Sequence, residues 1–325
     1  MHIRRLAFEG LRALPDFEAT GLRRVVPVAG TPAGRTAVAD AITIALSVFS
    51  ASDTQRAARD LGLGDACEVT GDGIPEELQV DRPEVAAALF TGQRAFKVKL
   101  DLELDPPQYG EIRAQALRDP RLVSALAARD TTLGLGIGWV FTRDWQVAAT
   151  SVLGVRLGDV ELPLIGDDRP PWLSRFLAGL SGRVHRHRAG TVDEPGHARA
   201  ERSPDPAQRR AARAVRETLA GRPFGLGELQ VVQGRSAWLG LPLGDALLPL
   251  RAHGPRVQHA VGLVQAVHQS GAEILVAEAP LDLAERPRSL ARWVRAQSEA
   301  DGSALEQVFL FGEGGAGALE PGSTG

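Results

Sequence analysis

One stretch near the start of the chain has the residue types and spacing of a phosphate-binding loop. Such loops read G-x-x-x-x-G-K-[ST] between a strand and a helix, since glycine lets the backbone approach the phosphates and lysine reaches them with a positive charge. Gly34, Arg35 and Thr36 occupy the last three positions, and the first glycine position falls on Ala29. The layout therefore predicts a site for a phosphate-containing ligand, with arginine in place of lysine.

Two residues of this loop depart from the motif. Arg35 keeps the positive charge, but its planar guanidinium is bulkier and aims its donors differently from an ammonium group. Pro32 is the larger departure, because such a loop presents backbone N–H groups to phosphate oxygens and proline has none. Thr36 keeps the hydroxyl that would bind Mg²⁺. The residues that we expect to contact the ligand are Gly30, Thr31, Ala33, Gly34, Arg35 and Thr36.

Composition limits the classes of protein to which this chain can belong. Its 325 residues, 44% of them hydrophobic, allow one large domain or two modest ones. A net charge of −3 gives no overall attraction for nucleic acid, and a single cysteine, Cys67, excludes an intramolecular disulfide and a zinc ribbon. The first residues lack the apolar core of a signal peptide, and the apolar run at 41–49 is too short to span a bilayer. We therefore expect a soluble cytoplasmic protein without membrane contact.

Hydrophobic periodicity predicts an α/β chain whose first half is rich in antiparallel strands. Residues 95–104 alternate apolar and charged side chains, which is typical of a half-buried strand. Residues 36–50 have the spacing of a helix with one buried face, and 156–159 form a predicted turn between two strands. The other expected strands span residues 2–8, 22–28, 132–140, 146–153, 155–162, 273–277 and 307–311. The other expected helices span residues 206–220, 260–269 and 286–299.

Residues 166–215 differ from the rest in composition, with many prolines and arginines. This composition predicts an exposed insertion that is partly disordered before the helix at 206–220. His185, His187 and His197 are expected in a solvated basic loop rather than on a metal, since this segment contains no cysteine. The arginines of 183–216 are interleaved with acids, which favours a solvated mixed-charge segment over a nucleic-acid surface.

A second motif lies in the last third of the chain. The apolar run 274–277 is followed by Glu278 and Pro280, which is the form of a buried strand that ends in an acid. In type and order, the loop, the helix, this acidic strand and the last strand resemble the ABC-type ATPase heads of the RecF, SMC and Rad50 kind. The resemblance is closest to the small bacterial AAA-labelled ATPases, which include the OLD-like proteins. It covers residues 1–50 and 236–312 by motif, and the middle by strand pattern only.

The resemblance implies a P-loop NTPase fold, an ABC-type ATPase head with a mixed sheet and an antiparallel subsheet. It also implies ATP and Mg²⁺ as ligands, with Thr36 and Glu278 as the metal-binding residues. If Pro280 matches the proline of the family, Glu278 is the Mg²⁺ acid and Ala279 replaces the catalytic glutamate. Alternatively, Glu278 is the catalytic acid and Ala277 replaces the Mg²⁺ acid. Both alignments lack one of the two acids.

Two further family motifs are incomplete. The signature loop of the family, Leu-Ser-x-Gly-Glu, falls on residues 251–255, where only Gly254 is retained. The histidine that follows the last strand in the family is missing near residues 312–313. The family also usually has a glycine where this chain has Pro32. The resemblance therefore implies a retained scaffold with weakened chemistry.

Three functional hypotheses follow. The first is a pseudo-ATPase, a scaffold or regulatory subunit that acts as a homodimer or heteromer through its head surface. The second is a slow ATPase, completed by a dimer mate or by an intact ATPase or nuclease partner, in DNA maintenance or phage defence. The third is an interaction module without nucleotide. We expect two halves of one head at residues 1–165 and 216–312, the insertion at 166–215 between them, and a flexible tail at 313–325.

Overall fold

The computed structural model describes most of the chain, in two compact units. The described residues are 1–9, 16–31, 34–36, 38–39, 41–42, 46, 95–116, 132–141, 147–157, 160–162, 179–188, 190–233, 237–278, 287–300 and 304–311. Unit 1 contains those that fall within Met1–Arg23 and Ala29–Val184, and unit 2 those within Arg24–Val28 and His185–Ala318. No described helix is both long enough and apolar enough to cross a membrane.

Unit 1 is built on a six-stranded sheet in the order β2-β1-β4-β5-β6-β7, and every neighbouring pair is antiparallel. Its strands are β1 (His2–Glu9), β2 (Phe17–Thr20), β4 (Ala95–Glu103), β5 (Thr132–Phe141), β6 (Val147–Leu157) and β7 (Val160–Leu162). The alternation predicted for 95–104 is confirmed, because Val98, Leu100 and Leu102 are fully buried. These side chains share one face of β4, since successive strand residues point to opposite faces.

The helix predicted at 36–50 is confirmed over its described part. Residues 34–36, 38–39, 41–42 and 46 are helical. Val38, Ala41, Ile42 and Leu46 are completely buried, as expected for one apolar face at a spacing of three and four residues. Ala45 and Phe49, which belong to the same predicted face, lie outside the described residues.

Unit 1 also corrects two expectations from the sequence. Strand β6 is continuous from Val147 to Leu157, so the break expected near 154 was wrong. The turn expected at 156–159 is confirmed in its second half, because Leu157 of β6 pairs with Val160 of β7. A register irregularity between β5 and β6 next to Gly136 lets β6 continue past the expected break. Helix α4 (Pro106–Ala116) was not predicted, because its sequence lacks the apolar periodicity of an amphipathic helix. The helix begins with a reciprocal cap, in which the Gln108 N–H donates to the Asp105 side chain at 2.8 Å and the Asp105 N–H donates to the Gln108 side chain at 3.3 Å.

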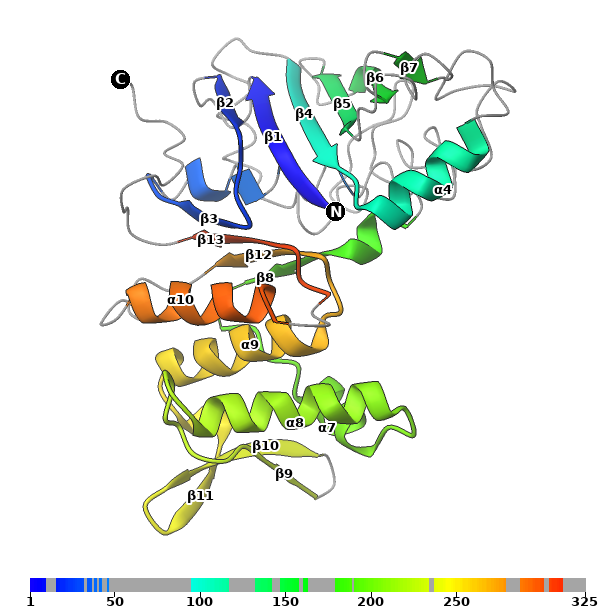
Figure 1. Cartoon of the computed structure of the whole chain (residues 1–325). Coiled ribbons are helices and arrows are strands. Elements are labelled where there is room, and N and C mark those ends of the chain that lie inside the picture. Colours follow the sequence, from blue (N-terminus) through cyan, green and yellow to red (C-terminus); the bar gives the residue numbers. More distant parts are fainter. Residues whose placement is uncertain are drawn as a thin grey trace. The chain divides into compact units, whose positions relative to one another are not determined.

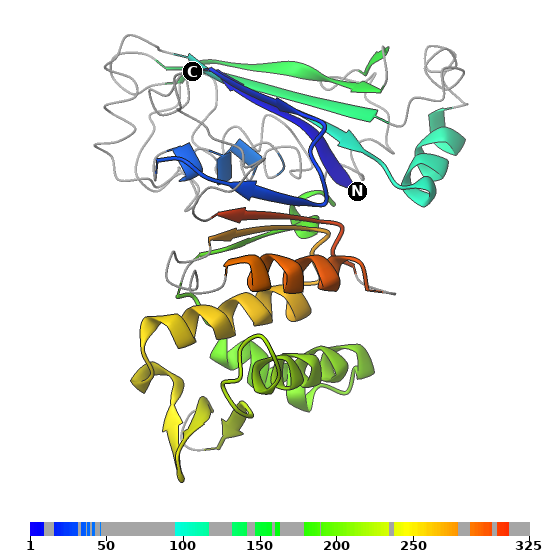
Figure 2. The same ribbon diagram turned by 60° about the vertical axis from the view of Figure 1, so that its left-hand side comes forward.

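Unit 2 is built on a four-stranded sheet in the order β3-β13-β12-β8. Its strands are β3 (Val25–Val28), β13 (Gln307–Phe311), β12 (Ile274–Glu278) and β8 (Val184–His187). Strand β13 is parallel to both β3 and β12. Figures 1 and 2 show α10 (Pro287–Ser298) and α9 (Pro255–Gln269) on one side of this sheet. The predicted strands at 273–277 and 307–311 are thus confirmed, and their apolar runs are typical of parallel strands.

Further layers of unit 2 pack on α9. Helices α7 (Glu194–Arg202) and α8 (Pro206–Ala220) form a hairpin beyond it, next to a three-stranded antiparallel sheet (Figure 1). The small sheet contains β9 (Gln230–Val232), β10 (Trp238–Leu243) and β11 (Ala246–Pro249). One apolar core joins these layers, and its fully buried members include Val215, Leu219, Leu229, Leu239, Val261, Val264, Leu275, Val294 and Val308.

The described part of 166–215 contradicts the expected exposed, partly disordered insertion. Residues 184–187 form strand β8 of the sheet, and α7 and α8 both have buried residues. His197 is 0% exposed and His187 4% exposed, so a solvated histidine loop was also wrong. The prolines misled the interpretation because each helix begins with proline in its first turn, after an N-cap aspartate, Asp193 or Asp205.

Candidate functional site

The phosphate-loop candidate begins directly after strand β3. Strand β3 ends at Val28, Ala29 is buried, and Gly30 has a positive φ of 95°. This is a backbone conformation that glycine adopts without strain, so the loop needs glycine there for its turn. Helical structure is present from Gly34, and both Arg35 and Thr36 are half-buried. The predicted order of strand, glycine-containing turn and helix is confirmed, whereas Pro32 and Ala33 lie outside the described residues.

Thr31 caps the helix that follows the loop. Its side-chain hydroxyl oxygen accepts the N–H of Gly34 at 3.1 Å, and its carbonyl oxygen accepts the N–H of Arg35 at 3.0 Å. A threonine three residues before the bonded amide is a usual N-cap arrangement. Two N–H groups that a phosphate would approach are therefore already bonded within the chain. The Thr-x-x-Gly spacing was visible in the sequence, but we read it only as part of the phosphate loop.

The two motif strands end at the same edge of the sheet in unit 2. In the strand register, Val28 of β3 pairs with Phe311 of β13, and Phe311 pairs with Glu278 of β12. Because neighbouring strands lie about 4.8 Å apart, the backbones of Val28 and Glu278 are about 10 Å from each other. Ligands of open α/β sheets bind at such carboxyl edges. Both strands therefore belong to one sheet, as a Mg²⁺ site shared by Thr36 and Glu278 would require, whereas that site itself stays a prediction.

The candidate signature loop leads into helix α9. A short 3₁₀ turn, η4 (Leu250–Ala252), precedes it, and Gly254 is the N-cap of α9, with Pro255 as the first helical residue. No side chain caps this end of the helix, and a Cβ added at Gly254 would have no atom within 4 Å. The helix thus begins five residues earlier than predicted from 260–269, because a proline fits the first helical turn. Ala279, Pro280 and residues 312–313, on which the other motif arguments rest, lie outside the described residues.

Buried histidines lie near α9. His187 of β8 lies close to His185 and to His259 of α9, and burial together with these neighbours lowers the pKa of His187 to about 4. Burial also lowers the pKa of His197, although its bond to Gln269 and the charge of Glu201 oppose that shift. In the part of the chain that the structure describes, no group of three or more His, Cys, Asp or Glu side chains is placed to hold a metal ion. These histidines are therefore neutral interior groups near neutral pH.

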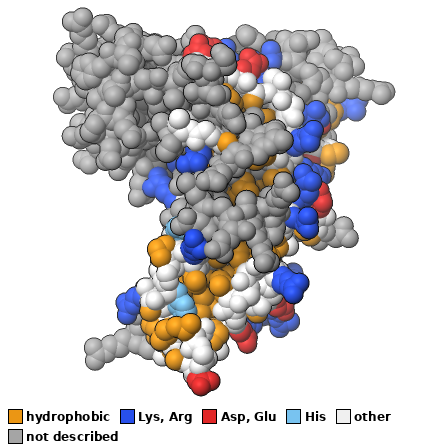
Figure 3. Space-filling model, turned by 90° about the vertical axis from the view of Figure 1, so that its left-hand side faces the viewer, with side chains coloured by type: hydrophobic (Ala, Val, Ile, Leu, Met, Phe, Trp, Pro, Cys, Tyr) orange, Lys and Arg blue, Asp and Glu red, His pale blue; other side chains and the backbone are white. Residues whose placement is uncertain are grey.

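The small sheet of unit 2 carries an apolar surface that the sequence did not indicate. Leu243, at the turn between β10 and β11, is 62% exposed, and no other large hydrophobic side chain among the described residues is fully on the surface. Figure 3 shows hydrophobic side chains gathered toward the lower end of the view, where unit 2 carries this sheet. Exposed apolar patches of this kind mark interaction surfaces. The alternation along β10 does not predict this exposure, because Leu239 and Leu241, which share a strand face with Leu243, are buried.

Comparison with solved structures identifies the fold. One matching structure is a complex of the SmcHead with the C-winged helix domain of ScpA. The two sequences are 12% identical, the structural match covers 98% of this chain and 91% of the SmcHead chain, and the TM-score is 0.51. Another is an Smc head domain with an extended coiled coil bound to the C-terminal domain of ScpA, derived from Pyrococcus furiosus. Its sequence is 9% identical, the structural match covers 95% of this chain and 89% of the Smc head chain, and the TM-score is 0.49. No protein-family model and no curated protein matches the chain.

The match with the SmcHead shows the class of fold. The chain has the α/β architecture of an SMC-type head, at an identity too low to carry over the function. The antiparallel sheet of unit 1 and the partly parallel sheet of unit 2 agree with the mixed-sheet expectation.

Proposed function

We propose that this chain is a pseudo-ATPase, a scaffold or regulatory subunit that binds ATP weakly at best and hydrolyses little of it. The observation that carries the proposal is the internal cap of the loop, in which Thr31 occupies the N–H of Gly34 at 3.1 Å. A phosphate group must displace this hydrogen bond before it can use the donor, which costs about 1 kcal/mol. Weak binding follows from this competition together with the N–H that Pro32 lacks.

The residues for hydrolysis are also reduced. Phosphoryl transfer needs a metal acid, a group that positions water, and donors for the transition-state charge. In this sequence Glu278 is followed by Ala279, so one acid is missing in either alignment, and only Gly254 remains from the signature loop. Arg35 retains a positive charge at the lysine position. The residues that remain therefore support the binding of a phosphate group more than the hydrolysis of ATP.

A slow ATPase is the alternative function, and one observation favours it. The strands that carry the two motifs are in register at one carboxyl edge, with Val28 and Glu278 separated by one strand. Thr36 is helical and half-buried next to the loop. In this alternative, Thr36 and Glu278 would hold Mg²⁺ with ATP, and a dimer mate or an intact partner would supply the missing groups. DNA maintenance or phage defence would be its setting.

Partner binding is the activity that such a scaffold retains. We propose a homodimer or a heteromer with an ATPase or nuclease, formed through the head surface. The exposed Leu243 and the apolar end of the small sheet support a contact surface in unit 2. The matched SMC head binds a domain of ScpA, which supports a protein partner for this chain. We also propose a relationship to the small bacterial OLD-like ATPases, since the longest described helix between 179 and 233 has 15 residues, too few for a coiled-coil arm.

Calorimetric titration of ATP with Mg²⁺ tests the proposal. We expect a dissociation constant in the range of about 0.1 mM or weaker, which corresponds to about 5.5 kcal/mol of binding free energy. Micromolar or tighter binding would reject the pseudo-ATPase and favour the alternative. The assignment of residues 1–165 and 216–312 to two halves of one head, with a tail at 313–325, stays a prediction.

A further inference from the structure

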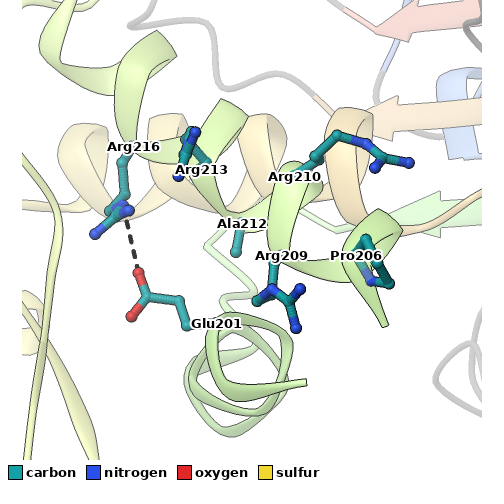
Figure 4. Close-up of a pocket in the computed structure, with 7 residues that line it drawn as sticks. All are labelled: Glu201, Pro206, Arg209, Arg210, Ala212, Arg213 and Arg216. Carbon is teal, nitrogen blue, oxygen red and sulfur yellow. Dashed lines mark ion pairs between the residues drawn. The ribbon is translucent and has the colours of Figure 1, made fainter. Parts of the chain in front are cut away.

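The hairpin of α7 and α8 contains a polar groove rich in arginine. Figure 4 shows its lining, which comes from α8 except for Glu201 of α7. The groove has a volume of about 350 Å³. Its lining residues are Glu201, Pro206, Arg209, Arg210, Ala212, Arg213 and Arg216. Four arginines and one carboxylate therefore line the groove, which gives it a formal local charge of +3 in a protein whose overall charge is −3.

The acids near this groove already have partners. Glu201 lies 3.4 Å from Arg216 and 3.6 Å from the imidazole of the buried His197. Asp205 caps α8 by accepting the N–H of Ala207 at 2.8 Å. The sequence interpretation used these interleaved acids to neutralise the arginines. In the structure, Asp205 caps α8 and Glu201 pairs with Arg216, so neither of these acids is paired with Arg210 or Arg213.

The arginines differ in how firmly they are held. Arg209 donates to the carbonyl oxygens of Ser203 and Pro204 at 2.7 and 3.0 Å, which fixes its guanidinium at the start of α8. Figure 4 shows Arg216 turned toward Glu201. Arg210 and Arg213 are exposed and have no hydrogen-bond or ion-pair partner among the residues that the structure describes. These two carry the uncompensated charge.

We propose that this groove binds a compact polyanion with two or more linked phosphates. Arginine is suited to such a ligand because its planar fork donates two parallel hydrogen bonds to phosphate oxygens. Arg209, Arg213 and Arg216 follow one another about one helical turn apart, so a ligand with several linked phosphates reaches all three guanidinium groups at once, and a single phosphate reaches fewer. A cavity of about 350 Å³ suits a small ligand, since such sites begin at about 300 Å³. The ligand class covers free oligophosphate and the phosphate chain of a nucleotide.

Titration of the full chain with inorganic tripolyphosphate tests the groove. The test variant is Arg210→Gln/Arg213→Gln, and the matched control is Arg199→Gln/Arg202→Gln, which removes the same charge from α7 outside the groove lining. We expect the test variant to lose affinity by about 100-fold, and the control by less than about threefold. Equal losses in both variants would show a diffuse charge effect and overturn the proposal, as would no binding to the wild type. Because both arginines are exposed, circular dichroism should show unchanged folding. The single variant Arg213→Glu repeats the test if the double variant is unstable.

Two further arms separate the ligand sources. Glu201→Gln removes the one carboxylate of the groove lining and leaves Arg216 with Glu228 alone, at 4.0 Å, so it should tighten tripolyphosphate binding by about threefold or more. Unchanged or weaker binding would contradict the role of the arginine excess. If ATP competes with tripolyphosphate in the wild type, the ligand is the phosphate chain of a nucleotide, and otherwise it is free oligophosphate. Binding of a single-stranded oligonucleotide without binding of tripolyphosphate would make the groove a nucleic-acid surface and reject the proposal. Micromolar ATP binding that Arg210→Gln/Arg213→Gln leaves unchanged would count against the proposed function only and not against the groove.

Discussion

Replacing Thr31 by valine tests whether the internal cap limits phosphate binding. Valine has the shape of threonine but no hydroxyl, so the Gly34 N–H loses its partner at 3.1 Å while the bond from Arg35 N–H to the Thr31 carbonyl remains. Loss of an N-cap costs about 1 kcal/mol of stability. In the wild type, a phosphate must overcome this same free energy before it can accept the Gly34 N–H. The variant should therefore unfold about 1 kcal/mol more easily and bind ATP about five times more tightly.

Two titrations measure the opposite effects of this change. Urea denaturation gives the stability, and calorimetry with ATP and Mg²⁺ gives the affinity. Thr218→Val is the matched control, because it removes a hydroxyl that lies 3.1 Å from His268 between α8 and α9. The control should lose similar stability without any gain in ATP affinity. If Thr31→Val loses stability but binds ATP no more tightly than the wild type, the cap does not compete with phosphate and our reasoning is wrong.

Three more predictions concern the core, the acid response and the loop. Burial lowers the pKa of His187 to about 4, so the unfolded chain binds this proton first and the free energy of unfolding should fall by about 2 kcal/mol between pH 7 and pH 5. Urea denaturation at both pH values measures this, and greater stability at pH 5 would contradict it. Gly262→Ala should destabilise the protein by about 1–3 kcal/mol, because its Cβ would lie 2.1 Å from a backbone carbonyl oxygen, whereas Gly110→Ala in α4 has open space and should stabilise it by about 0.5–1 kcal/mol. Equal thermal shifts for the two variants would refute this close approach. Pro32→Gly should tighten ATP binding by about tenfold, and more than Arg35→Lys does, which calorimetry on both variants decides.

The sequence predicted the elements whose signal is local. The last strand was predicted at 307–311 and is Gln307–Phe311, and α8 was predicted at 206–220 and is Pro206–Ala220. Both have strong periodicity or continuous apolar character, which depends on neighbouring residues only.

Features that depend on distant partners could not be predicted. The burial of His197 results from packing of α7 on α9, where its imidazole lies 3.2 Å from Gln269, 72 residues away in the chain. The register that aligns Val28 with Glu278 is likewise set through β13. The arginine groove depends on which acids are used as caps and ion pairs, and charge counting along the sequence treats all acids alike. Thr31 fits both the phosphate-loop motif and a helix N-cap, and the sequence argument used only the motif.

Turnover of ATP by the isolated chain decides whether this protein is a pseudo-ATPase. Purified protein is incubated with ATP and Mg²⁺ at saturating ATP, phosphate release is followed over hours, and Thr36→Ala is measured beside the wild type. The account predicts that phosphate release by the wild type is indistinguishable from that of Thr36→Ala and of buffer. Steady turnover by the wild type that Thr36→Ala abolishes would contradict it and show a working ATPase.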